Sequence, residues 1–274
     1  MSRIGIFDSG LGGLVILNDV LNELPEYDYI YLGDNAHVPY GSRNINDIYD
    51  LTLQGIQALI SKDCSLIILA CNTATAAALR RIQQTYLPHL EPEIKVLGVI
   101  RPASEVILEE GYRSVGVLAT EATVRSESFI RELNHIGFHG PIHQIAAPLL
   151  VPFIESGNWN SGELESFLHS YLEPFNNGVV DSLILGCTHY GLFTSRIQQL
   201  VGSGIHVIAE GKYVSQKLAT YLKRHPEVEH QLSKNRSRDY FVTGEPTSYQ
   251  HFARIILTDH FLPHSQIFPL SETA

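Results

Sequence analysis

Residues 67–73 read IILACNT, and residues 183–189 read LILGCTH. Each stretch is an apolar run that ends in a cysteine, Cys71 in the first and Cys187 in the second, followed by side chains that form hydrogen bonds. Short apolar runs bounded by polar turns are typical of parallel strands that are buried on both faces of a sheet. The sequence therefore predicts two buried strands that each end at a cysteine.

A second pair of stretches is related in the same way. Residues 4–9 read IGIFDS, and residues 115–120 read VGVLAT. The two cysteines are 187 − 71 = 116 positions apart, and the second pair is 115 − 4 = 111 positions apart, so the offsets are nearly equal. Two echoes in the same order at similar offsets indicate two related α/β domains, with a strand-final cysteine at the same place in each.

Between these stretches, short β-rich runs alternate with longer helical patterns, one of which predicts a helix over residues 73–86. Repeated strand–helix units imply parallel sheets that are covered by helices. We therefore expect the α/β class, with two similar parallel-sheet domains related by pseudo-symmetry and the active site in the cleft between them. The expected domains are residues 1–97 plus 210–274 on the Cys71 side and residues 98–209 on the Cys187 side.

The composition is that of a soluble globular protein with a substantial core, because 44% of the 274 residues are hydrophobic and 18% are charged. The formal net charge of −10 argues against a nucleic-acid partner, since nucleic-acid-binding surfaces normally carry a basic excess. No apolar stretch is long enough to span a membrane, and an acid, Asp8, precedes any long apolar region, unlike in a signal peptide. We therefore expect a cytoplasmic protein without a membrane partner.

The chain has three cysteines, Cys64, Cys71 and Cys187, and no CxxC pair. An odd number of cysteines without such a pair fits a reducing compartment and no disulfide framework. A free cysteine is by default a small buried hydrophobic residue, and Cys64 is interpreted in that way. The other two cysteines differ because each lies at the carboxyl end of an expected strand.

Other polar side chains fall at the same strand ends, where ligands bind in open parallel sheets. Taken singly, Asp8, Asn72 and Thr188 are ordinary helix-capping residues, and His189 is an ordinary structural histidine. Their convergence with two cysteines predicts a single functional site. Helix N-termini next to both cysteines would bind a carboxylate and lower the pKa of a thiol.

Several motifs resemble those of the glutamate racemase family, within the aspartate/glutamate racemase superfamily, and they follow the family order over most of the chain. They are residues 6–13 (IFDSGLGG), 31–34 with 38–41 (YLGD and VPYG), 70–74 (ACNTA), 98–102 (GVIRP), 151–155 (VPFIE), 185–190 (LGCTHY) and 242–246 (VTGEP). The two cysteine motifs together with DSG and PYG form a highly specific set. The resemblance implies reversible interconversion of L- and D-glutamate without pyridoxal phosphate, another cofactor or a metal.

The resemblance also implies roles for individual residues. Cys71 would be the base for the D-isomer and Cys187 the base for the L-isomer. Asp8 would assist Cys71, and His189, with Glu155 nearby, would assist Cys187. The substrate-binding residues that the resemblance implies are Asp8, Ser9, Pro39, Tyr40, Gly41, Asn72, Thr73, Thr188 and His189.

Beyond the site, the resemblance implies that glutamate is the small-molecule partner and that D-glutamate feeds peptidoglycan synthesis, and thereby cell-wall biogenesis and cell shape. Many relatives form dimers, so a homodimer is the assembly to test. The chain departs from the family pattern at several positions, none of which is an expected catalytic residue. These departures bear on the shape of loops and on regulation. The departures are Asn35 and His37 in place of Thr and Arg, Gly191 in place of Pro, and Ala209-Glu210-Gly211 in place of an Asp followed by a small residue.

Paired cysteines suit racemisation, because one proton leaves one face of the α-carbon and another arrives on the opposite face. One sulfur must be a thiolate while the other is a thiol, and the ordinary cysteine pKa of about 8.5 lies near the working pH. Without a cofactor, hydrogen-bond donors such as Asn72, Thr73 and Thr188 would stabilise the developing carbanion.

Four alternatives remain open from the residues alone. Aspartate is the alternative substrate within the superfamily. A Cys-His hydrolase or transferase would use one cysteine as its nucleophile and leave the other idle. A metal site made of Cys71, Cys187 and His189 would lack a usual structural zinc spacing. A non-catalytic two-domain protein would bind an acidic amino acid without inverting it.

Overall fold

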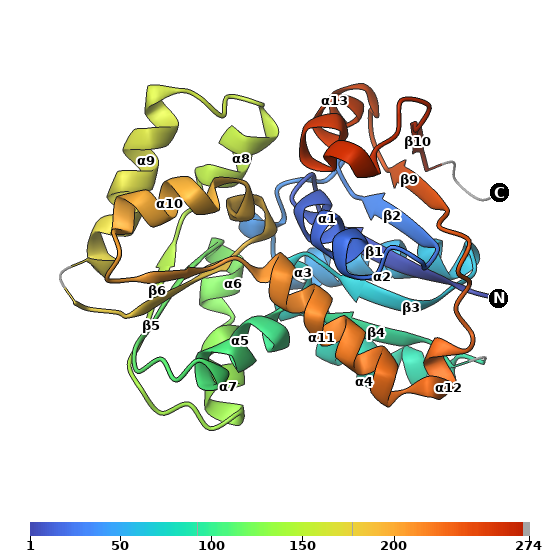
Figure 1. Cartoon of the computed structure of the whole chain (residues 1–274), viewed down its shortest axis with the longest axis horizontal. Helices are drawn as coiled ribbons and strands as arrows, with labels where there is room; N and C mark the ends of the chain where they lie inside the picture. Colours follow the sequence, from blue (N-terminus) through green and yellow to red (C-terminus); the bar gives the residue numbers. More distant parts are fainter. Residues whose placement is uncertain (92, 177, 271–274) are drawn as a thin grey trace.

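The computed structural model describes residues 1–91, 93–176 and 178–270, and the strands of this part of the chain form two sheets in which every pair is parallel. Figure 1 shows the sheets in two lobes, with β5 and β6 at the left and β1, β2 and β3 at the right. The six-stranded sheet has the order β10 (Ile267–Pro269), β9 (Arg238–Val242), β2 (Tyr29–Gly33), β1 (Arg3–Asp8), β3 (Cys64–Leu69), β4 (Lys95–Gly98). The four-stranded sheet has the order β6 (Ile142–Ala146), β5 (Val115–Ala119), β7 (Ser182–Gly186), β8 (His206–Ile208).

The two sheets share one strand order, which confirms the expected pair of similar parallel-sheet domains. Four adjacent strands of the larger sheet run β2-β1-β3-β4, and the smaller sheet runs β6-β5-β7-β8, so each begins with the second strand, followed by the first, third and fourth. The echoed stretches are β1 with β5 and β3 with β7. Within each sheet the echoed strands are neighbours in register: Phe7 pairs with Leu69, and Ala119 pairs with Gly186. Parallel pairing therefore brings the polar residues that follow both strands to one edge.

The central strands are buried on both faces, as continuous apolar runs require. Side chains alternate along a strand, so Ile6 and Ile68 pack into one hydrophobic cluster while Phe7 and Ile67 pack into the cluster on the other face. Close helix packing supports this arrangement, because a Cβ atom added at Gly55 would lie 2.2 Å from the Phe7 ring. The strand ends that carry the site are therefore held between two filled layers.

Helices cover these sheets and connect consecutive strands. In the six-stranded lobe they are α1 (Gly13–Glu23), α2 (Ile45–Ser61), α3 (Asn72–Ala74), α4 (Arg80–Thr85), α12 (Pro226–Glu229) and α13 (Thr247–Ile256). In the four-stranded lobe they are α5 (Ile100–Glu109), α6 (Glu121–Arg125), α7 (Ser128–His135), α8 (Leu150–Glu155), α9 (Gly162–Leu172) and α10 (Thr194–Val201). The long helix α11 (Glu210–Arg224) follows β8 and packs against both α1 and α5, so it lies on the seam between the lobes (Figure 1).

The helix expected over residues 73–86 is wrong in one respect, because it is not a single α-helix. A π-helical segment, Thr75–Leu79, separates α3 from α4. Thr75 Oγ1 donates a hydrogen bond to the carbonyl oxygen of Leu69 at 3.0 Å, which ties the widened turn to the last residue of β3. Single π-helical turns are frequent at functional sites. The spacing of apolar residues over one turn is too short to tell a π-helical turn from an α-helical one. None of the described helices combines the length and the apolar character needed to cross a membrane.

Candidate active site

Cys71 lies two residues after the end of β3 and caps the short helix α3. Its Sγ accepts a hydrogen bond from the backbone N–H of Ala74 at 3.4 Å and lies 3.3 Å from Ser9 Oγ. Burial and the negative charge of Asp8 nevertheless raise the pKa of this thiol to about 12. The hydrogen bond from the N-terminus of α3 lowers this pKa, as expected, but burial and the charge of Asp8 outweigh it.

Cys187 lies directly after β7, on the other lobe, and has a different helper. Its Sγ is 3.8 Å from Nδ1 of His189, and Nε2 of the same ring is 2.6 Å from Oε1 of Glu155. Burial alone lowers the pKa of His189, but hydrogen bonds to Cys187 and Glu155 oppose it and hold that pKa well above its usual value. A ring that carries both protons donates to the sulfur and to the carboxylate at once.

Glu155, at the end of α8, is held by groups from three other segments. Its Oε1 accepts a hydrogen bond from the backbone N–H of Leu11 at 2.8 Å, and its Oε2 accepts one from the Tyr249 hydroxyl at 3.0 Å. Tyr249 belongs to α13, almost at the end of the chain, and the sequence analysis missed it. No local pattern marks it, because a single tyrosine on an amphipathic helix is an ordinary core residue.

Asp8 lies between the two lobes and contacts both. One carboxylate oxygen accepts from the backbone N–H of Gly10 at 2.8 Å, and the other accepts from the Thr188 hydroxyl at 3.1 Å. Burial raises the pKa of Asp8 to about 6, while the positive charge of His189 and these hydrogen bonds limit the rise. Asp8 therefore gains or loses a proton close to neutral pH, a property that suits proton transfer.

The glycines of the first turn allow the two lobes to meet. A Cβ atom added at Gly10 would lie 2.2 Å from Oε1 of Glu155, and one added at Gly12 would lie 2.4 Å from Oγ1 of Thr188. At Gly12 the backbone nitrogen of His189 would also lie only 2.6 Å from the added atom, so a larger residue there requires the backbone of the second lobe to shift. The glycines of the DSGLGG motif thus permit close approach between the lobes.

Residues 39–41 form a loop beside the Cys71 side of the site. The Val38–Pro39 bond is cis, and the Tyr40 hydroxyl donates to Asp34 Oδ2 at 2.5 Å. Tyr40 packs in the same hydrophobic cluster as Cys71, and a Cβ atom added at Gly41 would lie 2.7 Å from Cβ of Thr120. The structure records no hydrogen bond from this loop to either sulfur, so Pro39, Tyr40 and Gly41 border the site without joining its hydrogen-bond network.

Thr120 is a second residue that the sequence analysis missed. Its hydroxyl oxygen lies 2.8 Å from Oγ1 of Thr73, which links the loop after β5 to the helix that Cys71 caps. A signal for it was present, because the echo of residues 4–9 with 115–120 aligns Thr120 with Ser9. Each lobe therefore places a hydroxyl after its first strand, facing the site.

Asn72, next to Cys71, points toward the seam helix. Its Nδ2 donates to Oε1 of Glu210, the first residue of α11, at 2.7 Å. Glu210 in turn borders a cavity of about 190 Å³ whose lining also includes Cys187, Thr188 and Asp19. The candidate active site is thus a narrow polar seam, joined across the lobes by the Asp8–Thr188 and Thr73–Thr120 contacts.

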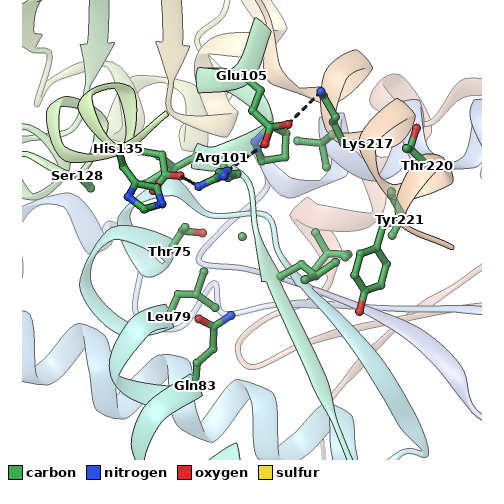
Figure 2. A pocket seen from close by; sticks show the side chains of 18 of the residues that line it. Thr75, Leu79, Gln83, Arg101, Glu105, Ser128, His135, Lys217, Thr220 and Tyr221 are labelled. Carbon is green, nitrogen blue, oxygen red and sulfur yellow. Dashed lines mark hydrogen bonds and ion pairs between the residues drawn. The ribbon is translucent and has the colours of Figure 1, made fainter. Parts of the chain in front are cut away.

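A larger cavity, of about 1140 Å³, lies elsewhere between the lobes and is lined from α4, α5, α7 and α11. Figure 2 shows Lys217 of α11 next to Glu105 of α5. Their charged atoms are 3.0 Å apart, and Arg101 lies 2.6 Å from Glu132 within the four-stranded lobe. Neither Cys71 nor Cys187 lines this cavity. The volume of a cavity therefore does not identify the site of the two thiols. That site is identified by the polar and ionisable side chains that meet around Cys71 and Cys187.

A metal centre was one of the alternatives. Within residues 1–91, 93–176 and 178–270, no three His, Cys, Asp or Glu side chains are grouped so that they could hold a metal ion. The cluster of Cys187, His189 and Glu155 is instead a linear chain of hydrogen bonds, in which the ring separates the sulfur from the carboxylate.

Comparison with known proteins agrees with this geometry. The family model of Asp/Glu/Hydantoin racemases matches residues 16–214. A glutamate racemase from Roseobacter denitrificans is 39% identical over 89% of this chain and 92% of its own length. The crystal structure of a Bacillus anthracis glutamate racemase covers 98% of this chain and 96% of its own, with 29% identity and a TM-score of 0.85. That of the Francisella tularensis glutamate racemase in complex with D-glutamate covers 97% and 96%, with 28% identity and a TM-score of 0.84. This chain therefore belongs to the Asp/Glu/Hydantoin racemase family and is an amino-acid racemase.

Proposed function

We propose that this racemase interconverts L- and D-glutamate without a cofactor, with Cys71 and Cys187 as the two bases on opposite faces of the α-carbon. The observation that carries the proposal is the place of the two thiols. Each follows the third strand of its sheet, and the loops around them are joined across the lobes by the Thr188–Asp8 hydrogen bond. The Francisella tularensis relative, solved with D-glutamate, supports the choice of substrate.

The surroundings of the two thiols determine which sulfur removes the α-proton of L-glutamate and which sulfur supplies a proton. At neutral pH the raised pKa of Cys71 leaves a proton on that sulfur. Doubly protonated His189 donates to Cys187, so this sulfur is the one equipped to accept the α-proton of L-glutamate. Cys71 then supplies its proton to the other face, which gives D-glutamate.

The cycle closes when Cys71 regains a proton and Cys187 loses one. Asp8, whose raised pKa is about 6, exchanges protons near neutral pH and returns one to Cys71. When ionised, Asp8 also adds a negative charge near Cys71, which favours the protonated thiol. The proton that Cys187 gained passes to solvent when the product leaves, and doubly protonated His189, held by Glu155, stabilises the thiolate that results. Backbone donors at the start of α3 and the Thr188 hydroxyl are suited to stabilise charge that develops on the substrate in a site without bulk water.

The same proposal includes the biological setting. D-Glutamate made here would enter peptidoglycan synthesis, and the chemistry requires both cysteines to stay reduced, as in the cytoplasm. The proposed domain division, residues 1–97 plus 210–274 against 98–209, assigns one thiol and one sheet to each wall of the site.

Circular dichroism of the purified protein with L-glutamate, D-glutamate, L-aspartate or D-aspartate tests this function. Loss of optical signal from both glutamate enantiomers, with aspartate slower by at least an order of magnitude, is expected. The reaction should persist after dialysis against a chelator and after treatment with hydroxylamine, which removes pyridoxal phosphate. Faster inversion of aspartate would overturn the substrate, and loss of activity on either treatment would overturn the cofactor-free mechanism.

A further inference from the structure

Glu210 is a buried carboxyl group that the two-thiol mechanism does not use. It is the first residue of α11, at the return from the four-stranded lobe, and only 3% of its surface is exposed. One oxygen, Oε1, accepts from Asn72 Nδ2 at 2.7 Å. Asn72 directly follows Cys71, so a group from late in the chain contacts the residue beside the first thiol.

Each of these two side chains has one buried atom without a partner. Asn72 Oδ1 and Glu210 Oε2 make no hydrogen bond within the part of the chain that the structure describes. Both would be acceptors if the carboxyl were ionised, and two unsatisfied buried acceptors are costly. A protonated carboxyl instead has one O–H donor, and the acceptor it needs is present on the amide that already donates to Oε1.

The electrostatics around Glu210 agree with a neutral acid. Burial raises its pKa well above the usual value, and the Asn72 hydrogen bond, which lowers it, does not compensate. A buried carboxylate is normally paired with a cation. The influences on the pKa of Glu210 are burial and Asn72, and no cation is among them.

We propose that Glu210 is a positioning residue that acts as a neutral acid. It accepts a hydrogen bond from Asn72 Nδ2, donates one from Oε2 to Asn72 Oδ1, and so fixes the carboxamide beside Cys71. This paired contact joins α11, which packs on both lobes, to the helix that Cys71 caps. The effect of this contact on glutamate racemisation rests on the proposed function, whereas the hydrogen-bonded pair of Glu210 and Asn72 is a property of the folded chain.

Two substitutions separate a neutral acid from a carboxylate. In Glu210→Gln, the new amide can accept from Asn72 Nδ2 and donate to Asn72 Oδ1, as the acid does. We expect kcat/KM within about threefold of the wild-type value. Glu210→Ala leaves both polar atoms of Asn72 unpaired, and we expect kcat/KM to fall about 10- to 100-fold. The same fall in both variants would overturn the neutral-acid pair.

Infrared spectroscopy gives a readout that does not depend on activity. At pH 8, where Asp8 with its pKa of about 6 is ionised, the infrared difference spectrum of wild type minus Glu210→Gln should show the carbonyl stretch of a protonated carboxylic acid. Glu163→Gln is the matched control, because it makes the same substitution at an exposed residue in the first turn of α9, away from the thiol site. It should keep the Glu210 band and change kcat/KM by less than about twofold. Absence of the band from the wild-type protein would overturn the proposal.

The two proposals fail in different ways. If the wild-type protein did not racemise glutamate while the infrared band and its loss in Glu210→Gln were observed, the function would be wrong and the paired contact right. If glutamate were racemised while Glu210→Gln was as impaired as Glu210→Ala, the function would stand and the neutral acid would be refuted.

Discussion

The two thiols occupy the same place in their sheets but have opposite electrostatic surroundings. Cys71 follows β3 and Cys187 follows β7, and these strands correspond in the shared order. Cys71 is held by neutral donors and lies near the Asp8 carboxylate, whereas Cys187 faces an imidazole that is backed by Glu155. The repeated topology sets where the sulfurs lie, and side chains that differ between the two lobes give each sulfur its own electrostatic environment.

This asymmetry has a thermodynamic limit. Enantiomers have equal free energies, so kcat/KM must be the same for L- and D-glutamate. The different surroundings of the thiols can therefore give L- and D-glutamate different kcat values and different KM values, but the ratio kcat/KM must stay equal for the two enantiomers. The experiments that test the comparison accordingly perturb one side at a time.

The largest expected effect comes from removing one sulfur. Cys71→Ser and Cys187→Ser should each lower racemisation by at least about 10³-fold, because each leaves one face without its acid or base. In deuterium oxide, Cys71→Ser should still exchange the α-proton of L-glutamate without inversion, and Cys187→Ser should act on D-glutamate only. Nuclear magnetic resonance of the recovered amino acid measures both. Exchange of the opposite enantiomers would reverse the assignment of the faces, and near-normal racemisation by either variant would refute the two-base mechanism.

The next largest effect comes from removing the negative charge of Glu155, whose carboxylate contacts His189. Glu155→Gln keeps the shape of the side chain but removes the negative charge that helps to raise the pKa of His189. We expect kcat to fall about 10²-fold, the scale of general acid–base assistance, while the fold is kept. Tyr249→Phe removes a neutral donor to the same carboxylate and is the control, with an expected change below about fivefold. Equal effects of the two variants would show that packing, and not the charge of Glu155, matters to the Cys187 side.

Asp8 connects the two sides, and its burial has a consequence for stability. The pKa is raised from 3.8 to about 6 in the folded state, so the fold prefers the protonated form and loses stability as the pH rises through this range. The shift of about 2 units corresponds to about 3 kcal/mol at most. Asp8→Asn should therefore raise the free energy of unfolding at pH 7 by about 1 to 3 kcal/mol while activity falls.

Urea unfolding of wild-type and Asp8→Asn proteins between pH 3.5 and 7.5 measures this difference. It should be small below about pH 4 and reach its full value above about pH 6, because the Asp8 carboxyl is protonated in both states at the acid end. A pH-independent difference would contradict the raised pKa and attribute the effect to altered packing.

The smallest expected effect tests the hydroxyl bridge between the lobes. Thr120→Val removes the contact with Thr73 and the side-chain cap of α6, and should cost about 1 kcal/mol of stability with a change of a few fold in KM. Thr85→Val, on an exposed hydroxyl that bonds within its own helix, is the control and should change neither quantity measurably. An unchanged KM in Thr120→Val would show that this bridge serves the fold alone.

Much of the fold was accessible from particular stretches of sequence. The apolar runs before Cys71 and Cys187 predicted β3 and β7, and the echo of residues 4–9 predicted that β5 corresponds to β1. The π-helical turn after Cys71 was not predicted, because its apolar spacing is almost that of an α-helix. Thr120 was within the echo, and Glu210 was noted only as a departure from the family pattern, whereas Tyr249 carries no local signal.

By itself, the sequence determined the class of fold, the two strand-final cysteines and several of the polar residues that lie around them. These properties are local or repeated, so periodicity and motif spacing record them. Only the tertiary structure decided that Cys71 has a raised pKa while Cys187 faces a protonated imidazole, and that Glu210 contacts Asn72. Burial and charge at a site depend on side chains from distant segments, and the distances that fix their energies exist only once the two lobes have packed together.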